Sequence, residues 1–496
     1  MKFGKSAKKI FAGILSAGFM VSTVITGITA FGTVSYAQTS EELAAEAEAR
    51  KSLPIQSNEI ENWPDGPEVS SEAAIVMEIN TGTILYAKNI NEQLYPASTT
   101  KIMTCLLASE NAALSDTVTF SYEAVHSLPS GASNIGMDEG QSITMEEALY
   151  GILVGSANEV ANAVAEHVSG SIDDFVELMN EKAKELGCTN THFANTNGLH
   201  DDNHYTSVYD MALIASEFFS NELLSRISNT ARYHFVATST QPDDFYITNT
   251  HAMVTGEYSY TGLVGGKTGY TDEARRTLVT CAERDGMKLV CIVFKNEAPS
   301  QYTDTITLLD YGFNNFQAIN VSENDETYIP TDTSFFSSSN DIFGNSSAII
   351  EFDSDDYIIL PTNATIEDTE STISYDVSNS DNEKAIAIVT YTYNGEYVGS
   401  ATIQTVSQST TALGSSSEEG NGELSENQFS TNNVIYINVR YIDRVLLLVA
   451  VSVSLIAIIH SFLIHNHIIH SREVRKRMKK RKKEAKRFKL NIDNYK

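Results

Sequence analysis

Serine and lysine residues in three short segments of this chain could together carry out acyl transfer. The first segment contains Ser98 and, three residues later, Lys101. The second contains Ser156 and Asn158, and the third is Lys267–Gly269; they follow 58 and then 111 residues apart. A serine hydroxyl becomes a nucleophile when an adjacent base takes its proton, and an uncharged lysine amine can be that base. The three segments therefore predict a serine acyl-transfer site that uses lysine in place of histidine.

The spacing of Ser98 and Lys101 indicates one face of a helix, which we expect over Thr99–Ala108. Residues three apart are neighbours on a helix, and the amides at a helix N-terminus favour the anion that forms on attack. The flanking residues are apolar, so the face should be buried, and burial lowers the pKa of a lysine by disfavouring its charged form. A neutral Lys101 could then accept the proton of Ser98.

Taken alone, the first two segments also have ordinary structural explanations. A surface helix can carry a serine and a lysine at this spacing by chance, as Ser6 and Lys9 do. Ser156 lies where two helical runs break, so it could be a helix cap. Its hydroxyl could also relay a proton to a leaving group, while the amide of Asn158 holds a substrate carbonyl.

The third segment, Lys267–Gly269, could likewise be a plain glycine-rich turn, since it follows two further glycines. Glycines on a strand also allow another backbone to approach closely, and an extended peptide could pair along such an edge. In that case Lys267 and Thr268 would receive the terminal carboxylate of the peptide. The order and spacing of all three segments favour this functional interpretation over three separate coincidences.

Strands at both ends of the central region, with helices between them, predict an α/β unit in which helices cover an antiparallel sheet. An Asp-Gly turn joins the last two strands. The expected strands are Ala73–Ile79, Thr83–Ala87, Thr277–Cys281 and Lys288–Phe294, and the expected helices include Met145–Val154, Ala157–His167 and an amphipathic helix that ends at Gly187.

Both ends of the chain carry signals for the membrane. Residues 1–37 resemble a signal peptide, with a basic start, an apolar run and small residues before Gln38; an N-terminal membrane anchor is the alternative. Residues 38–65 are expected to be a leader or linker. The apolar run Val445–Ile464 predicts a transmembrane helix over 441–465, and the basic tail 466–496 should stay in the cytoplasm. The catalytic part would then lie outside the cell.

Short β-like runs and an Asn394-Gly395 turn predict a small all-β domain over 316–405, followed by a flexible, polar spacer over 406–440. The net charge of −30 argues against a nucleic-acid partner; it would attract cations or cationic substrates, or serve solubility alone. Of the four cysteines, Cys105, Cys188, Cys281 and Cys291, we expect free buried thiols, with Cys281 and Cys291 as the alternative disulfide pair. The sequence predicts no metal and no cofactor.

Residues 66–315 resemble the D-alanyl-D-alanine carboxypeptidases, the low-molecular-mass penicillin-binding proteins. The chain shares the three catalytic motifs with this family, and further phrases match it. The matching phrases are Tyr95–Thr104, Ser133–Gly136, Leu149–Gly151, Thr191–Phe193, Asn197–Leu199 and Gly266–Thr271. The resemblance implies a transpeptidase/β-lactamase-like catalytic domain, with a β domain, a spacer and a membrane attachment after it.

The resemblance also implies a reaction and a role for each motif residue. Ser98 would attack the bond between the last two D-alanines of a peptidoglycan stem pentapeptide, and β-lactams would acylate the same serine. Lys101 would be the base and Ser156 the proton relay. Asn158 would orient the substrate, and Lys267, with Thr268 and Gly269, would bind it; backbone amides, including that of Ser98, would form the oxyanion hole.

Two departures from the family pattern stand out. Arg275 follows Ala274 where the family usually has glycine, so a bulky cation could alter access to the site. The predicted C-terminal anchor also has the length to span a bilayer, whereas that of the family is commonly an amphipathic helix on the surface.

Three other functions remain open at this point. A D,D-endopeptidase would use the same site. A β-lactamase would need a carboxylate near the acyl bond, and Glu159, on the helix beside Asn158, is poorly placed for that task. A non-catalytic wall-binding protein is the third, although all the reactive residues are present.

Overall fold

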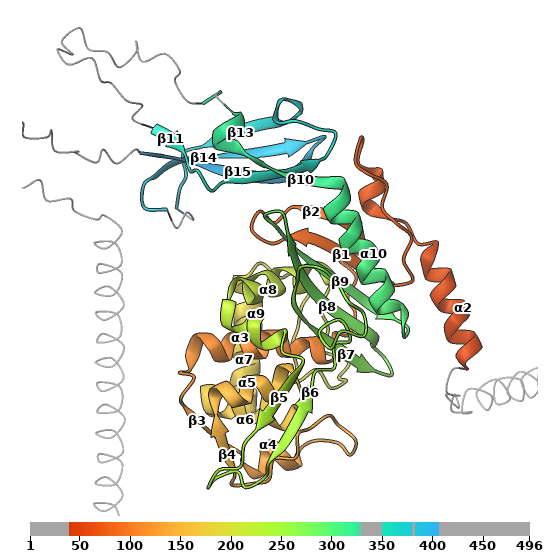
Figure 1. Ribbon diagram of the computed structural model, residues 1–496, viewed down its shortest axis with the longest axis vertical. Helices are drawn as coiled ribbons and strands as arrows, with labels where there is room; N and C mark the ends of the chain where they lie inside the picture. Colours follow the sequence, from red (N-terminus) through yellow and green to blue (C-terminus); the bar gives the residue numbers. More distant parts are fainter. Residues whose placement is uncertain (1–38, 326, 329–349, 379–381, 406–496) are drawn as a thin grey trace, which may run out of the picture. The chain divides into compact units, whose positions relative to one another are not determined.

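The computed structural model describes residues 39–325, 327–328, 350–378 and 382–405, which belong to one compact unit (Figure 1). The predicted signal peptide, the spacer, the transmembrane helix and the basic tail lie outside these residues. Within the described ranges, no helix combines the length and the apolar character needed to cross a bilayer.

A five-stranded antiparallel sheet lies at the centre of the molecule, with strand order β2-β1-β9-β8-β7. Strand β7 is an edge strand, so one side of it is open to a ligand. A tight turn at Asp285 and Gly286, both in the left-handed region with φ of 50° and 81°, joins β8 to β9; this confirms the predicted Asp-Gly turn. The strands are β1 (Ala73–Glu78), β2 (Ile84–Lys88), β7 (Leu263–Thr271), β8 (Arg275–Arg284) and β9 (Met287–Asn296).

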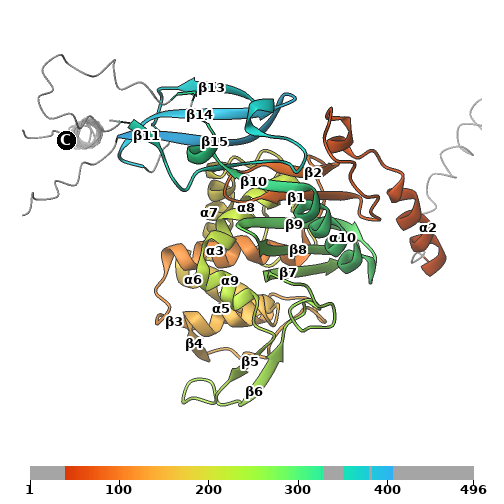
Figure 2. The same ribbon diagram turned by 45° about the horizontal axis from the view of Figure 1, so that its top comes forward.

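The two faces of this sheet belong to two hydrophobic cores (Figure 2). Helix α10 (Ser300–Asn315) covers one face, and a group of helices covers the other. Cys281 lies opposite Val290 and Cys291 lies opposite Thr280. Because side chains alternate along a strand, the two sulfurs point to opposite faces: Cys281 lies in the core under the helices, and Cys291 in the core under α10. All four cysteines are free thiols.

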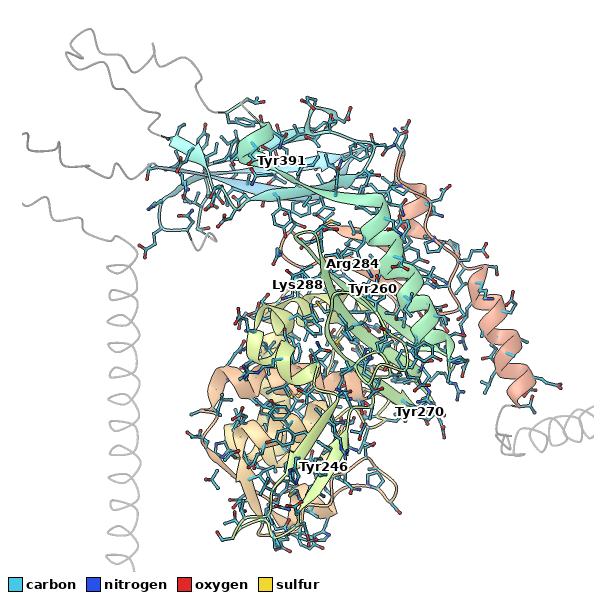
Figure 3. All side chains as sticks on the ribbon, viewed as in Figure 1. Tyr246, Tyr260, Tyr270, Arg284, Lys288 and Tyr391 are labelled. Atoms are coloured by element: carbon cyan, nitrogen blue, oxygen red, sulfur yellow. The ribbon has the colours of Figure 1, made fainter. Side chains whose placement is uncertain are left out.

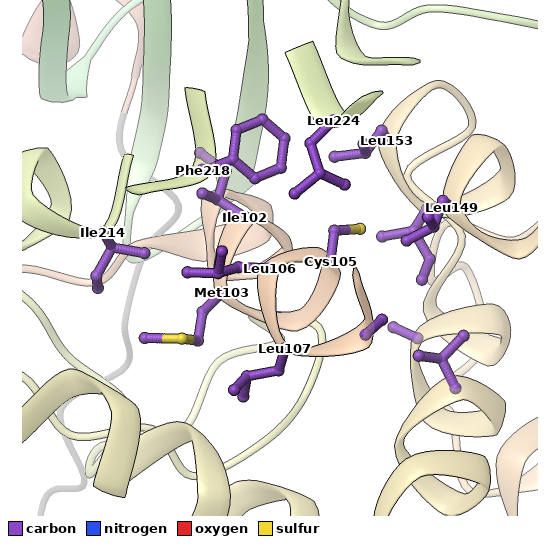
Figure 4. Packing of buried hydrophobic residues seen from close by; sticks show 14 of the residues in the cluster. Ile102, Met103, Cys105, Leu106, Leu107, Leu149, Leu153, Ile214, Phe218 and Leu224 are labelled. Carbon is purple, nitrogen blue, oxygen red and sulfur yellow. The ribbon is translucent and has the colours of Figure 1, made fainter. Parts of the chain in front are cut away.

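Helix α3 (Lys101–Asn111) runs through the middle of the helical layer and is buried on almost every side from Lys101 to Ala108. Figure 4 shows its apolar side chains among residues of α5, α8 and α9. The predicted start at Thr99 is replaced by a 3₁₀ turn, η2 (Ala97–Thr100), which leads into the helix. The surrounding helices are α5 (Met145–Leu153), α6 (Asn158–Ser169), α7 (Ile172–Glu185), α8 (Val208–Ser220) and α9 (Glu222–Ser228).

The segment expected to be a leader or linker contains ordered structure. A capping box between Thr39 and Glu42 starts helix α2 (Ser40–Lys51). Trp63, further along, is buried and donates from Nε1 to the carbonyl oxygen of Leu85 at 2.9 Å. The smaller elements are η1 (Gln56–Glu59), α4 (Tyr122–His126) and two hairpins, β3 (Thr117–Thr119) with β4 (Ser142–Thr144) and β5 (Arg232–Phe235) with β6 (Phe245–Thr248).

Strands also dominate the described residues after 315. A four-stranded antiparallel sheet has the order β11-β15-β14-β13, and β10 pairs with β12. Asn394 and Gly395, with φ of 49° and 86°, form the tight turn predicted between β14 and β15. The elements are β10 (Phe316–Asn320), α11 (Val321–Asn324), β11 (Ile350–Phe352), β12 (Tyr357–Pro361), η4 (Ile366–Asp368), β13 (Glu370–Ser374), β14 (Ala385–Tyr393) and β15 (Glu396–Thr405).

Candidate active site

The three motif segments meet at one cavity of about 350 Å³. Ser98, Ser156, Asn158, Thr268 and Gly269 line it. The two motif lysines lie behind this wall, with Lys101 0% and Lys267 1% exposed. Residues from a 3₁₀ turn, a helix break and an edge strand, far apart in the sequence, therefore share one site.

The turn that carries Ser98 is strained and tightly held. Ala97 has a φ of 49°, a left-handed conformation that costs free energy for a residue with a Cβ atom. The hydroxyl of Thr277 donates to the carbonyl oxygen of Pro96 at 2.9 Å, and that of Thr100 donates to Ala97 at 2.8 Å. Gly198 packs so closely that a Cβ there would lie 1.8 Å from the Ala97 oxygen. These contacts fix the nucleophile before substrate arrives.

Lys101 contacts the nucleophile directly. Its Nζ lies 3.1 Å from Oγ of Ser98, 2.6 Å from Oδ1 of Asn158 and 2.6 Å from the carbonyl oxygen of Asn197. A neutral amine has two N–H donors and one lone pair. The two carbonyl oxygens take the donors, so the lone pair is left for the Ser98 hydroxyl proton. This is the geometry that a general base requires.

Burial favours that neutral form of Lys101. Desolvation lowers the pKa of its amine well below the usual range, and the nearby charge of Lys267 lowers it further. Cys105 and Glu159 act in the opposite direction, but their effects are smaller than those of burial and of Lys267. This downward shift favours the free base, which is the form that a lysine needs to activate a serine.

Ser156 lies at a break between α5 and α6, with a φ of 56°. It does not cap the second helix, because Ala157 occupies the N-cap position and no side chain caps it. The Ser156 hydroxyl oxygen instead accepts a hydrogen bond of 3.0 Å from Nζ of Lys267, which also donates to the carbonyl oxygen of Thr268 at 2.9 Å. Desolvation lowers the pKa of Lys267 to about 7.

Gly269 allows β7 to approach the nucleophile. A Cβ at this position would lie 2.3 Å from Oγ1 of Thr277 and 2.9 Å from the backbone nitrogen of Ser98. Only glycine therefore leaves space beside the Ser98 amide, where a developing oxyanion could accept a hydrogen bond. The neighbouring Thr268 points its hydroxyl at that of Thr250, 2.6 Å away.

A second set of polar residues supports the site, and none of these residues has a role predicted from the sequence. Oδ1 of Asn162 accepts hydrogen bonds from the Thr196 hydroxyl and the Asn197 side chain, at 2.6 and 3.2 Å, which holds the loop whose carbonyl faces Lys101. His204 hydrogen-bonds Thr100 at 2.7 Å, and burial lowers its pKa to about 3. Asn162 lies one helical turn after Asn158, which is the signal that could have drawn attention to it.

Arg275, the cation that departs from the family pattern, is turned away from the cavity. Its guanidinium makes two hydrogen bonds to the carboxylate of Glu297, at 2.9 and 2.7 Å. Arg275 also has a φ of 55°, a conformation in which glycine would carry no strain. It is not among the residues that line the cavity.

Comparison with known proteins identifies relatives of the region that carries the site. A family model described as D-alanyl-D-alanine carboxypeptidase matches residues 60–298. The D-alanyl-D-alanine carboxypeptidase DacF of Bacillus subtilis is 38% identical over 253 residues, which cover 50% of this chain and 63% of the relative. DacB2 of Mycobacterium tuberculosis, also named a D-alanyl-D-alanine carboxypeptidase, is 31% identical over 256 residues, which cover 50% of this chain and 84% of that protein.

Among solved structures, penicillin binding protein 6B from Escherichia coli has a similar fold. The TM-score is 0.51, and the match covers 69% of this chain and 98% of that chain. Sequence identity is 21%, so this likeness bears on the fold alone. It agrees with the predicted arrangement of helices on an antiparallel sheet.

Proposed function

This chain belongs to the D-alanyl-D-alanine carboxypeptidase family of serine peptidases, and we propose that it removes the terminal D-alanine from peptidoglycan stem pentapeptides. The observation that carries the proposal is the contact between Lys101 and Ser98, 3.1 Å from Nζ to Oγ, at the wall of the cavity. The aligned region spans 63% of the Bacillus relative, so the activity is proposed on the site itself and not only on relatedness.

Acylation begins when Lys101 takes the proton of Ser98. The serine Oγ then bonds to the carbonyl carbon between the last two D-alanines, and the negative charge moves to the carbonyl oxygen. The Ser98 amide, in the space left by Gly269, donates to that oxygen. The carbon–nitrogen bond breaks as the tetrahedral intermediate collapses, which leaves the acyl group on Ser98.

The leaving D-alanine needs a proton on its amine. Ser156 lines the same cavity and has its oxygen held by Lys267, so its hydroxyl hydrogen is free to point at the leaving nitrogen. The proton taken from Ser98 replaces the one that Ser156 gives up. Water then attacks the acyl carbon while a base at the site takes a proton from the water. The bond between the acyl carbon and Oγ of Ser98 breaks, and Oγ receives that proton.

The position of Glu159 favours this activity over that of a β-lactamase. Its Oε1 accepts a hydrogen bond of 2.7 Å from the amide of Ile135, and it is not among the residues that line the catalytic cavity. A carboxylate fixed in that way does not reach an acyl group on Ser98. The D,D-endopeptidase alternative uses the same groups and is distinguished by substrate.

Three further parts of the proposal rest on the sequence and the family. We propose that β-lactams acylate Ser98 and inhibit the enzyme. We propose a small all-β domain over 316–405, supported by the strands described in that range. We also propose a signal peptide at 1–37 and a transmembrane helix at 441–465, which would place the catalytic part outside the cell, attached to the membrane.

Labelling with a fluorescent penicillin tests the function. The wild-type protein should form a covalent band that survives denaturation, and Ser98→Ala should form none. D-alanine release from a pentapeptide, and cleavage of a cross-linked peptide dimer, should be measured on the same two proteins. A band that persists in Ser98→Ala would mean that another residue is the nucleophile, and cleavage of the dimer alone would favour the endopeptidase.

A further inference from the structure

The family resemblance assigns the terminal carboxylate of the substrate to Lys267, but the structure hides this ammonium. Lys267 is 1% exposed, and it donates to Ser156 and to the carbonyl oxygen of Thr268. It is not among the residues that line the cavity. A carboxylate in the cavity therefore needs another cation within direct reach.

Arg276 supplies a cation at the wall of the cavity. It lies on β8 directly opposite Tyr270 of β7, and its guanidinium carbon lies 4.4 Å from the centre of that ring. The other arginines of this strand are neutralised, because Arg275 pairs with Glu297 and Arg284 with Asp310. Arg276 has no such acidic partner among the described residues.

The neighbouring wall has hydrogen-bonding capacity that the protein itself does not use. Gln301 also lines the cavity, is 6% exposed, and its Oε1 has no hydrogen-bond partner within the described part of the chain. The hydroxyls of Thr250 and Thr268, which hydrogen-bond each other, lie at the same wall. Buried polar atoms without partners are rare unless a ligand or water completes them; the Gln301 oxygen only accepts hydrogen bonds, so it would take an N–H or O–H of the ligand or of a water, and the carboxylate needs the donors of Arg276 and the threonine hydroxyls.

We propose that Arg276 binds the terminal carboxylate of the substrate and so determines that the enzyme acts at a free C-terminus. The planar guanidinium presents paired N–H donors that match a carboxylate, and the Tyr270 ring holds it at the edge of β7 (Figure 3 labels Tyr270). Lys267 supports this subsite from behind, through Thr268 and Ser156. This inference rests on the proposed function, because it concerns the same reaction.

Two peptide substrates distinguish the role of Arg276 in carboxylate binding from the proposed peptidase function. One is an N-acylated tripeptide that ends in D-alanyl-D-alanine with a free carboxylate, and the other is the same peptide with a C-terminal amide. Arg276→Gln should lower kcat/KM on the acid roughly 10- to 100-fold, the range expected for a lost hydrogen bond to a charged group, mainly through KM. On the amide, the variant and the wild type should differ by less than about 3-fold.

Arg284→Gln is the matched control. This arginine lies at the other end of β8, stacks over Tyr260 at 4.2 Å and does not line the cavity (Figure 3). It should leave the ratio of acid to amide turnover unchanged. Arg276→Lys, which keeps the charge but not the paired donors, should recover part of the lost turnover on the acid.

Three outcomes are decisive. Equal losses on acid and amide in Arg276→Gln, or no loss on the acid, would overturn the role of Arg276 while leaving the proposed function intact. A wild type that cleaves neither peptide in a Ser98-dependent way, with release of D-alanine from the acid or D-alaninamide from the amide, would overturn the proposed function itself. If Arg276→Gln does not fold, Arg276→Lys decides: an unchanged preference for the acid would contradict the proposal, because lysine cannot reproduce the paired contact.

Discussion

Lys267 donates a hydrogen bond of 3.0 Å to Oγ of Ser156, which couples the glycine-rich edge strand to the helix break on the opposite wall of the cavity. Because Oγ of Ser156 accepts this hydrogen bond, its hydroxyl hydrogen remains available to donate to the substrate. It also places a second amine near Lys101, and its charge lowers the pKa of Lys101. One buried lysine thereby orients the relay and helps to keep the base neutral.

Stability should depend on pH through Lys267. Its pKa in the folded protein is about 7, whereas that of a lysine in an unfolded chain is about 10.4. Between these values the unfolded state binds the extra proton, so the free energy of unfolding rises with pH, by at most about 1.4 kcal/mol per pH unit for this group. Lys267→Met lacks this contribution, so the wild type should gain stability relative to the variant between about pH 7 and 10.

Urea unfolding of both proteins at several pH values measures this difference. Lys184→Met, at an exposed position on α7, is the control, and its difference from the wild type should stay constant over the same range. A constant difference for Lys267→Met as well would show that Lys267 keeps its proton in the folded state. In that case Lys267 would stay charged over this range, and its charge would go on lowering the pKa of Lys101.

Loss of the base should affect acylation much more than binding. Lys101→Met removes the lone pair that faces Ser98, and we expect acylation by a fluorescent penicillin to slow by roughly 10²- to 10⁴-fold. Lys101→Arg keeps a donor for Asn158 and Asn197 but stays charged, so it should be slow as well. Time courses of band formation measure the rates, and thermal unfolding checks that each variant is folded. Acylation at the wild-type rate in either variant would show that another group takes the proton.

The motif residues could be found from the sequence because their chemistry depends on spacing. Ser98 and Lys101 share a face in any helical turn, so their contact followed from a separation of three residues. The third partner of Lys101 is the backbone carbonyl oxygen of Asn197. Every residue type has such an oxygen, so this contact could not be predicted from the sequence. The position of Arg276 could not be predicted from the sequence either, because its place at the cavity depends on how β8 pairs with β7.

Tertiary context decided the other differences. Cys281 and Cys291 flank a tight turn, which made a disulfide plausible, but the register places their sulfurs on opposite faces of the sheet. The segment before residue 66 has the composition of a linker, yet Trp63 is buried and Arg50, at the end of α2, is 6% exposed. Trp63 hydrogen-bonds Leu85 and Arg50 hydrogen-bonds Lys295, each more than 20 residues away in the sequence. Patterns within one short segment cannot predict such distant contacts.

The strained Arg275 should serve stability and not catalysis. Its conformation, with φ of 55°, costs on the order of 1 kcal/mol relative to glycine. The paired hydrogen bonds to Glu297 offset this cost. The side chains of Arg275 and Glu297 are each 17% exposed, and Nη1 of Arg50 lies 3.8 Å from the same carboxylate. We expect the ion pair to outweigh the strain, so that Arg275→Gly lowers the free energy of unfolding by about 1 kcal/mol.

A double-mutant cycle with Glu297→Gln separates the two effects. In that background the charged partner is gone, so Arg275→Gly should become neutral or stabilising as only the relief of strain remains. Penicillin acylation should change less than about 3-fold in every member of the cycle, because Arg275 points away from the cavity. An equal destabilisation in both backgrounds would show that the pair contributes nothing. A large loss of acylation would show instead that the pair holds Tyr270 and the β7–β8 hairpin in place for catalysis.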